Sequence, residues 1–171
     1  MIALVATAAA EMIMTPVLAG QPTVGVPQTG RRYWADMSEE NVEIVRQFYD
    51  ALNRGDWDAV FRDTHPDFEL TTQRGPNAGT LRGREGVQGF GEDYIGAFGN
   101  FVVEPEEFVE KDDQVLALVT RRVRPTGGSV DIVVRNGHLW TVREGTILSM
   151  KSFPDPEKAL EAVGMRKTDR R

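Results

Sequence analysis

Few side chains in this sequence are candidates for acid–base chemistry in a pocket, and three of them lie between residues 65 and 94. His65 precedes Pro66, and an imidazole has a pKa suited to proton transfer near neutral pH. Glu69 alternates with Leu70 in a segment typical of a strand, so its carboxylate can act as a base if it points into a pocket. We therefore regard His65, Glu69 and Tyr94 as candidate catalytic residues. Capping of carbonyl groups at a helix end is the alternative, and simpler, role for His65.

The composition excludes several other kinds of site. The chain has no cysteine, so disulfides, thiolate catalysis and cysteine-based zinc or iron–sulfur centres are ruled out. Its two histidines are too few for a histidine-rich metal site, and no residue pattern indicates an organic cofactor. A formal net charge of -6 should repel nucleic acid and anionic membranes. We therefore expect no metal, no cofactor, no nucleic acid and no membrane among its partners.

The first 37 residues differ from the rest of the chain. Ile2–Ala10 is apolar, but prolines and glycines interrupt the sequence from residue 16 to residue 30. The apolar run and the small residues Val17–Ala19 resemble a secretory signal, whereas the absence of Lys or Arg before the run and the early Glu11 argue against one. The run is also too short to span a bilayer. We expect residues 1–37 to form a disordered extension of a cytoplasmic protein, with secretion as the second interpretation.

Three helices are expected in the first half of the remaining chain. Ser38 can cap a helix that Gly55 ends. Asp56 can cap a shorter second helix that stops before Pro66. Aromatic residues recurring on one side predict a third helix near Arg84–Phe98, although its glycines disfavour it.

The second half of the chain is rich in β-branched and aromatic residues between short turn signals. This pattern predicts four strands that pair antiparallel as a meander. The expected strands are Phe101–Val109, Val115–Arg124, Val130–Val142 and Thr146–Phe153, after a short strand at Phe68–Thr72. Asp155 and Pro156 begin a final helix. Helices followed by strands indicate the α+β class, with helices covering the concave face of a twisted sheet.

Four segments of the sequence resemble SnoaL-like proteins of the nuclear transport factor 2-like superfamily. They are Glu40–Asp58, Leu81–Gly86, His138–Gly145 and Glu157–Gly164, in the expected order and spacing. The resemblance covers residues 38–165 and leaves 166–171 as a polar tail. It implies a cone-shaped, barrel-like curved antiparallel sheet covered by three N-terminal helices, with a short C-terminal helix. The superfamily contains ketosteroid isomerases, polyketide cyclases, epoxide hydrolases, dehydratases and non-catalytic binding domains, so the fold alone does not choose a function.

This chain departs from that superfamily's enzymes at the positions that carry their chemistry. The resemblance places Phe48 at the tyrosine donor of ketosteroid isomerases, Thr72 at their base and Gly137 at their aspartate donor. None of these side chains can replace the group it stands for. Ser152 stands where cyclases and epoxide hydrolases have an essential aspartate, and Arg122–Arg124 replaces the Arg-x-Asp pair of the hydrolases. Arg122 could still bind an anionic ligand.

The resemblance also implies a ligand pocket with a mostly apolar lining. The expected lining residues are Phe48, Thr72, Phe90, Tyr94, Leu118, Thr120, Arg122, Gly137, Leu139, Leu148, Met150 and Ser152. Such a lining suits a small hydrophobic or weakly anionic molecule, unless the apolar members meet and fill the core. We therefore expect a small-molecule binding domain; the alternative is an isomerase, cyclase or hydrolase with a rearranged acid–base set. That set would be drawn from Glu69, Tyr94, Arg122 and His65. A filled interior would instead indicate an assembly module.

His138 and Trp140 are expected on the opposite, convex face of the sheet. They alternate with Gly137 and Leu139, which the resemblance places in the pocket. Proteins of this superfamily commonly dimerise through the convex face, and aromatic residues concentrate at such contacts. We therefore expect a homodimer with His138 and Trp140 at its interface, and no catalytic role for His138.

Overall fold

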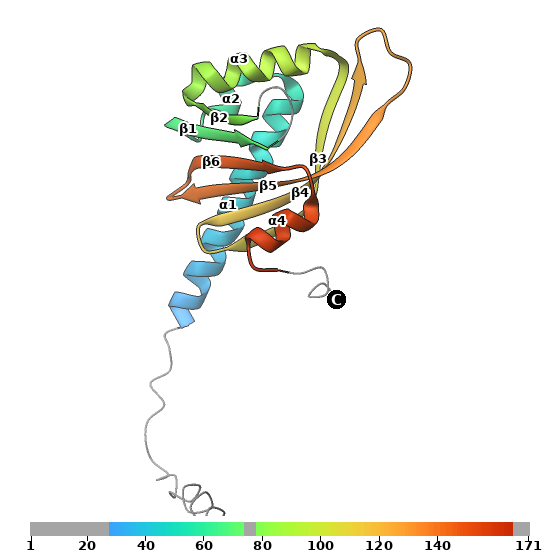
Figure 1. Cartoon of the computed structure of the whole chain (residues 1–171). Helices are drawn as coiled ribbons and strands as arrows, with labels where there is room; N and C mark the ends of the chain where they lie inside the picture. Colours follow the sequence, from blue (N-terminus) through green and yellow to red (C-terminus); the bar gives the residue numbers. More distant parts are fainter. Residues whose placement is uncertain (1–27, 74–77, 166–171) are drawn as a thin grey trace, which may run out of the picture.

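The computed structural model describes residues 28–73 and 78–165 (Figure 1). The expectations of a disordered extension or a secretory signal before residue 28, and of a polar tail at 166–171, lie outside the described residues. The elements in chain order are α1 (Gln28–Arg54), α2 (Trp57–Val60), β1 (Thr64–Thr72), β2 (Gly79–Arg82), α3 (Gly83–Gly96), β3 (Phe98–Lys111), β4 (Gln114–Pro125), β5 (Ile132–Arg143), β6 (Thr146–Phe153) and α4 (Pro156–Ala162). They confirm the α+β class.

The strands form one curved sheet that does not close into a barrel. Its order is β2-β1-β6-β5-β4-β3. Strands β3 to β6 make the expected antiparallel meander. β1 instead pairs with β6 in parallel, and β2 extends the sheet beyond β1. Figure 1 shows α1 behind the sheet and α4 in front of it, with α2 and α3 beside the β1–β2 end.

Two helices, not three, precede the sheet. Residues 79–82, which the sequence places in a loop, pair with 69–72 and form β2 before α3 begins. α1 also begins at Gln28 rather than at Ser38. The sequence has no proline between Pro27 and Pro66, so no residue of α1 lacks the backbone N–H that a helix needs. The end of α1 agrees with expectation, because Gly55 adopts a φ of 68° that suits glycine.

The sheet has a hydrophobic core on each face. On the concave face, Val45 and Tyr49 of α1 pack against Trp140 and Val142 of β5, and Ile147 of β6 joins the same cluster. On the convex face, α4 packs through a smaller cluster. Its buried members are Leu116, Leu118, Phe153, Ala159, Leu160 and Val163. Different helices therefore cover the two faces, α1 the concave face and α4 the convex face. The face to which a strand residue points decides which of these two clusters it joins.

A β-bulge in β6 sets which residues of β5 and β6 share the concave face. Val142 pairs with Ile147, but Thr141 pairs with Ser149 and Trp140 with Met150, so the strands are out of step by one residue. The unmatched residue is Leu148. A bulge of this kind exchanges the inward and outward positions of everything beyond it. Trp140 and Met150 consequently share the concave face.

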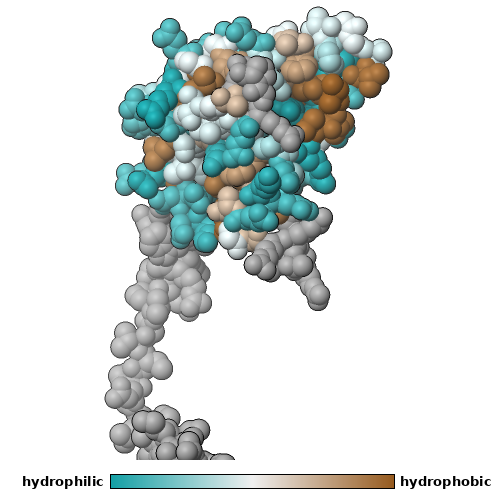
Figure 2. Space-filling view, viewed as in Figure 1, coloured by the Kyte–Doolittle hydropathy of each residue, from teal (hydrophilic) through white to brown (hydrophobic). Residues whose placement is uncertain are grey.

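Apolar side chains are also exposed near the tip of the β4–β5 hairpin. Val130, Ile132 and Val133 have exposed fractions of 71%, 47% and 54%. Figure 2 shows apolar surface on the side of the molecule where this hairpin projects in Figure 1.

Within residues 28–73 and 78–165, no helix is long and apolar enough to cross a membrane.

Candidate functional site

A cavity of about 530 Å³ lies between the concave face of the sheet and the helices α1, α2 and α3. Its walls are mainly apolar. Phe48 of α1, Trp57 of α2 and the stacked rings of Phe90 and Tyr94 on α3 line one side. Phe101 of β3 lines the other and meets the Tyr94 ring edge-on. Phe48, Phe90 and Tyr94 were among the lining residues implied by the resemblance, whereas Trp57 and Phe101 were not.

Half of the lining residues expected from the sequence lie on this cavity. They are Phe48, Thr72, Phe90, Tyr94, Met150 and Ser152. The expected positions of the other six are wrong. These are Leu118, Thr120, Arg122, Gly137, Leu139 and Leu148, which do not line it. The errors are confined to β4, β5 and the bulge residue of β6.

The bulge at Leu148 explains the errors on β5. Without it, the β5–β6 hairpin would pair Leu139 with Met150 and Gly137 with Ser152, which is the arrangement expected from the sequence. In the structure Met150 pairs with Trp140 and Ser152 with His138. Directly opposed residues of antiparallel strands point to the same face. Gly137 and Leu139 therefore point to the convex face, and His138 and Trp140 to the concave face.

The β4 residues follow β5 because the two strands are paired without a shift. Leu118 pairs with Gly137 and packs beneath α4. Thr120 and Arg122 point to the same convex side. The Thr120 hydroxyl donates to the Glu106 carboxylate, and Arg122 Nε donates to Glu104 at 2.9 Å. Arg122 is thus engaged in a surface ion pair and does not face the cavity.

The residues that do form the floor of the cavity are Arg121, Asn136 and His138, none of which was expected there. Arg121 stands on β4 opposite Val134, and Asn136 and His138 are the next inward positions of β5. Two atoms of this floor are buried and have no hydrogen-bond partner in the described structure: Nε of Arg121 and Oδ1 of Asn136. Only the strand register could have identified these residues, and the sequence does not display it.

His138 is held by a chain of hydrogen bonds that begins at Trp140. The Trp140 indole N–H donates to the Tyr49 hydroxyl oxygen at 3.0 Å, and that oxygen is 2.9 Å from Nδ1 of His138. Trp140 is 0% exposed and Tyr49 1% exposed, and burial raises the pKa of the Tyr49 hydroxyl, which stays protonated. The expectation that His138 and Trp140 form a dimer interface on the convex face is therefore wrong for these residues, because both side chains lie inside the subunit.

The family of this chain follows from its sequence as well as from this geometry. A model of the SnoaL-like domain matches residues 45–150, which is more than half of the chain. The chain belongs to the SnoaL-like domain family. A comparison with curated protein sequences finds no match.

Solved structures similar to this SnoaL-like domain have the same fold. TerC co-crystallised with polyporic acid is 26% identical and has a TM-score of 0.63, with 73% of this chain and 98% of TerC covered. An NTF2-like protein from Burkholderia pseudomallei is 24% identical and has a TM-score of 0.61, with 75% and 98% covered. A protein with a ketosteroid isomerase-like fold from Catenulispora acidiphila, in complex with trimethylamine, is 19% identical and has a TM-score of 0.60, with 72% and 93% covered.

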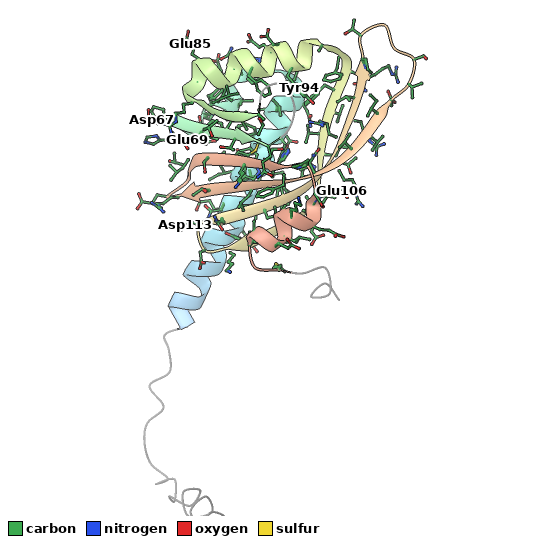
Figure 3. All side chains as sticks on the ribbon, in the orientation of Figure 1. Asp67, Glu69, Glu85, Tyr94, Glu106 and Asp113 are labelled. Atoms are coloured by element: carbon green, nitrogen blue, oxygen red, sulfur yellow. The ribbon has the colours of Figure 1, made fainter. Side chains whose placement is uncertain are left out.

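Of the four candidate acid–base residues, only Tyr94 lies on the cavity of this SnoaL-like domain. Glu69 forms an ion pair with Arg82 of β2 at 3.0 Å. His65 belongs to β1 and not to a helix end, and its Nδ1 accepts the Asp67 backbone N–H at 3.1 Å. Figure 3 shows Asp67 and Glu69 on β1, away from Tyr94 beneath α3. Among the described residues, the cavity lining contains no Asp or Glu.

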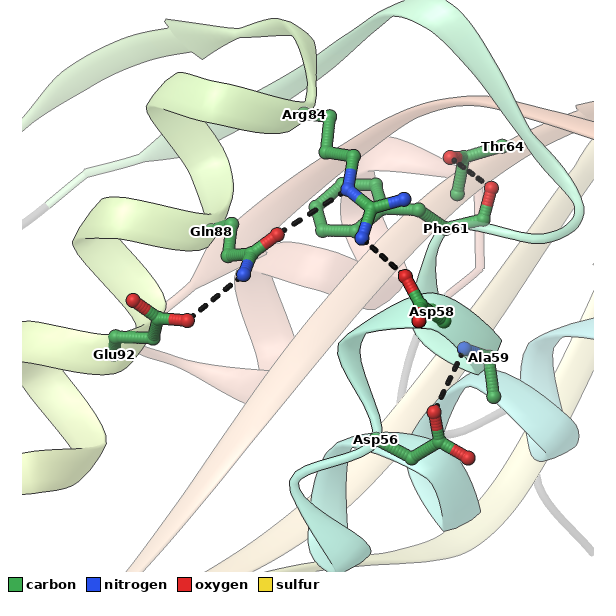
Figure 4. A network of polar contacts seen from close by, with 8 residues as sticks. All are labelled: Asp56, Asp58, Ala59, Phe61, Thr64, Arg84, Gln88 and Glu92. Atoms are coloured by element: carbon green, nitrogen blue, oxygen red, sulfur yellow. Dashed lines mark hydrogen bonds and ion pairs between the residues drawn. The ribbon is translucent and has the colours of Figure 1, made fainter.

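Contacts between α2 and α3 hold the helical side of the cavity together (Figure 4). Arg84 of α3 donates to the carboxylate of Asp58, and its guanidinium lies 5.4 Å from the centre of the Phe61 ring. Trp57 packs directly on Gly91, where an added Cβ would lie 2.3 Å from the indole ring. The SnoaL-like domain therefore needs glycine at this point of α3 for the two helices to approach.

We expect the stability of the SnoaL-like domain to fall with pH below about 6.5 because of His138. Burial, and then the positive charge of Arg121, lower the pKa of His138 to about 3 in the folded state, in which Nδ1 faces Tyr49. Between these two pH values the unfolded chain binds a proton that the folded chain does not, so unfolding is favoured as pH falls. The loss approaches about 1.4 kcal/mol per pH unit.

Urea titrations at pH values from about 7 down to 5 measure this loss, above the range in which the acidic groups Glu106 and Asp131 titrate. The variant His138→Gln serves as the control and should show a flatter pH dependence. A slope that is the same in both proteins would contradict the assignment to His138.

Proposed function

We propose that this SnoaL-like domain binds a small, largely apolar molecule in the cavity between its sheet and α1, α2 and α3. The observation that carries this proposal is an unfilled space of about 530 Å³ with aromatic and aliphatic walls and a few polar groups on one side. Its size and lining are those of small-molecule sites in general. TerC, a protein of similar structure, was crystallised with the small molecule polyporic acid, which supports a small-molecule ligand for this domain as well.

Binding is favoured over acid–base catalysis by what lines the cavity. Neither Glu69 nor His65 is on it, and no carboxylate is among the described lining residues. His138 is on it, but burial and the charge of Arg121 lower the pKa of its imidazole to about 3, which makes it a weak base near neutral pH.

Thr72 and Ser152 both face the cavity. The resemblance assigns the position of Thr72 to the base of ketosteroid isomerases, and that of Ser152 to the essential aspartate of cyclases and epoxide hydrolases. Their hydroxyl groups are too weakly basic for proton abstraction near neutral pH.

Two further parts of the proposal concern the protein's surroundings. We propose a homodimer, formed without His138 and Trp140, and a cytoplasmic location. The chain contains no cysteine, so its fold does not depend on the oxidising compartments in which disulfides form.

Filling the cavity should weaken binding. Val134 of β5 lines the cavity, whereas its neighbour Val133 is 54% exposed on the other side of the strand. Val134→Trp is expected to weaken the binding of the neutral fluorescent probe N-phenylnaphthylamine by about tenfold or more, because the indole occupies the probe's space. Val133→Trp adds the same group outside and should leave the dissociation constant within about twofold.

Fluorescence titration of the two variants and the unmodified protein gives these constants. No binding of the probe to the unmodified protein, or equal weakening by both substitutions, would contradict the location of the site.

A further inference from the structure

Arg121 differs from the other arginines on the described strands. Those arginines each form an ion pair with a carboxylate: Arg82 with Glu69, Arg122 with Glu104, Arg124 with Asp131, Arg135 with Glu106 and Arg143 with Asp113. Within the described chain, no carboxylate lies within ion-pair distance of Arg121. Its guanidinium instead lies 5.6 Å from the centre of the Tyr94 ring, inside the cavity.

A cation in this position lacks much of what stabilises a charge. Nε of Arg121 is buried without a hydrogen-bond partner in the described structure, and the walls around it are mainly apolar. A cation–π contact offsets only part of the cost of removing a guanidinium from water. An anionic group from outside the chain would supply the missing opposite charge to the guanidinium.

His138 offers a second donor beside Arg121. The Tyr49 oxygen accepts the Trp140 N–H, and its own hydrogen donates to His138 in the tautomer whose Nδ1 carries no proton. The imidazole is neutral near pH 7, so its single proton lies on Nε2. Nδ1 faces Tyr49, and Nε2 is on the opposite side of the ring. In this tautomer His138 is a neutral hydrogen-bond donor through Nε2–H.

Asn136 completes the polar floor with a side chain that is 6% exposed. Its Nδ2 points to the Phe153 carbonyl at 3.5 Å, which leaves Oδ1 as the buried atom without a partner. Asn136 and His138 are successive inward residues of β5, and Arg121 is diagonal to Asn136 on β4. Diagonal neighbours on one face of a sheet are within reach of long side chains. The three residues are therefore neighbours on the floor of the cavity.

We propose that the cavity selects organic anions: molecules with an apolar body and one carboxylate, whose oxygens contact the Arg121 guanidinium and Nε2–H of His138. This inference rests on the proposed binding function and specifies its ligand class. The apolar body lies against Phe48, Phe90 and Tyr94.

A matched pair of compounds tests this selectivity: naphthoate and the neutral naphthalenemethanol, which have the same ring system. Each is titrated against bound N-phenylnaphthylamine. We expect naphthoate to displace the probe at a concentration about tenfold lower than the alcohol does, which is the size of effect typical of a hydrogen bond to a charged group. Arg121→Met should remove this preference, whereas Arg122→Met, which removes an arginine from the convex face, should retain it.

The outcomes separate the two proposals. If the neutral probe does not bind, the binding function itself is wrong. If the probe binds but the two compounds displace it equally, or if Arg121→Met keeps the preference for naphthoate, only the selectivity for anions is wrong.

A second measurement uses the unmodified protein and does not depend on the folding of a variant. The imidazole ¹⁵N resonances of His138 report which nitrogen carries the proton. We expect the Nε2 resonance to shift when naphthoate is added, with the proton remaining on Nε2, and to shift less with naphthalenemethanol. Equal shifts with the two compounds, or a proton on Nδ1, would overturn the proposed contact.

Discussion

Replacing Trp140 with Ala is expected to lower the free energy of unfolding by about 3–5 kcal/mol, the usual cost of removing a fully buried aromatic side chain. Trp140 is 0% exposed, and its ring centre is 4.7 Å from that of Phe48 and 5.5 Å from that of Tyr49. The substitution also leaves the Tyr49 oxygen without the indole N–H that it accepts. Urea denaturation of the purified variant measures the change.

Ile132→Ala is the control for this experiment, because Ile132 is 47% exposed near the hairpin tip. Its effect on stability should stay within about 0.5 kcal/mol. Sedimentation of both variants distinguishes the buried position from the interface expected from the sequence. The interior position of Trp140 would be contradicted by a specific result: Trp140→Ala dissociates a dimer but lowers the free energy of unfolding no more than Ile132→Ala does.

Replacing Gly137 with Asp is expected to cost about 3 kcal/mol or more of stability and to create no active site. The resemblance to ketosteroid isomerases places Gly137 at their aspartate donor, so this substitution appears from sequence to restore a catalytic group. In the structure an added Cβ would lie 2.2 Å from the Cβ of Ala159 in α4. The new carboxylate would therefore be forced between the convex face and α4, away from the cavity. Thermal and urea denaturation measure the loss.

A double substitution shows whether the contact with α4 is the cause. Gly137→Ala alone should cost about 1–3 kcal/mol, since two Cβ atoms cannot approach this closely. Ala159→Gly alone should cost about 1 kcal/mol through its helix propensity. Combined, the two should cost clearly less than the sum of the separate losses. Additive losses would contradict the contact.

The elements of this fold could be predicted from the sequence wherever a local signal specifies them. Asp155 caps α4 through its side chain, with Pro156 at the first turn, as the residue types indicate. The β3–β6 meander follows from the β-branched segments and the short turns between them. β2 could not be predicted, because Gly79–Arg82 becomes a strand only through its partner β1. The parallel contact of β1 with β6 is equally a product of tertiary structure.

The candidate site was predictable on its helical side and not on its sheet side. Phe48, Phe90 and Tyr94 face the cavity because helical spacing alone determines the face of a residue. On β4, Arg121 and Arg122 are adjacent residues of the same type, so composition cannot tell which one points inward. The answer depends on the unmatched Leu148 in another strand. A shift of one residue in the strand register would therefore exchange the surface position of Arg122 and the cavity position of Arg121.

The parallel contact between β1 and β6 also determines when this domain can fold. β1 has only the short β2 as a partner until β6, close to the end of the domain, is available. Contacts between segments so distant in sequence slow the folding of a chain, because the intervening loop must first be closed. During synthesis, α1, α2 and β1 therefore leave the ribosome before the strand that completes their sheet exists. Their apolar faces stay uncovered for that interval, in which the chain is most exposed to aggregation.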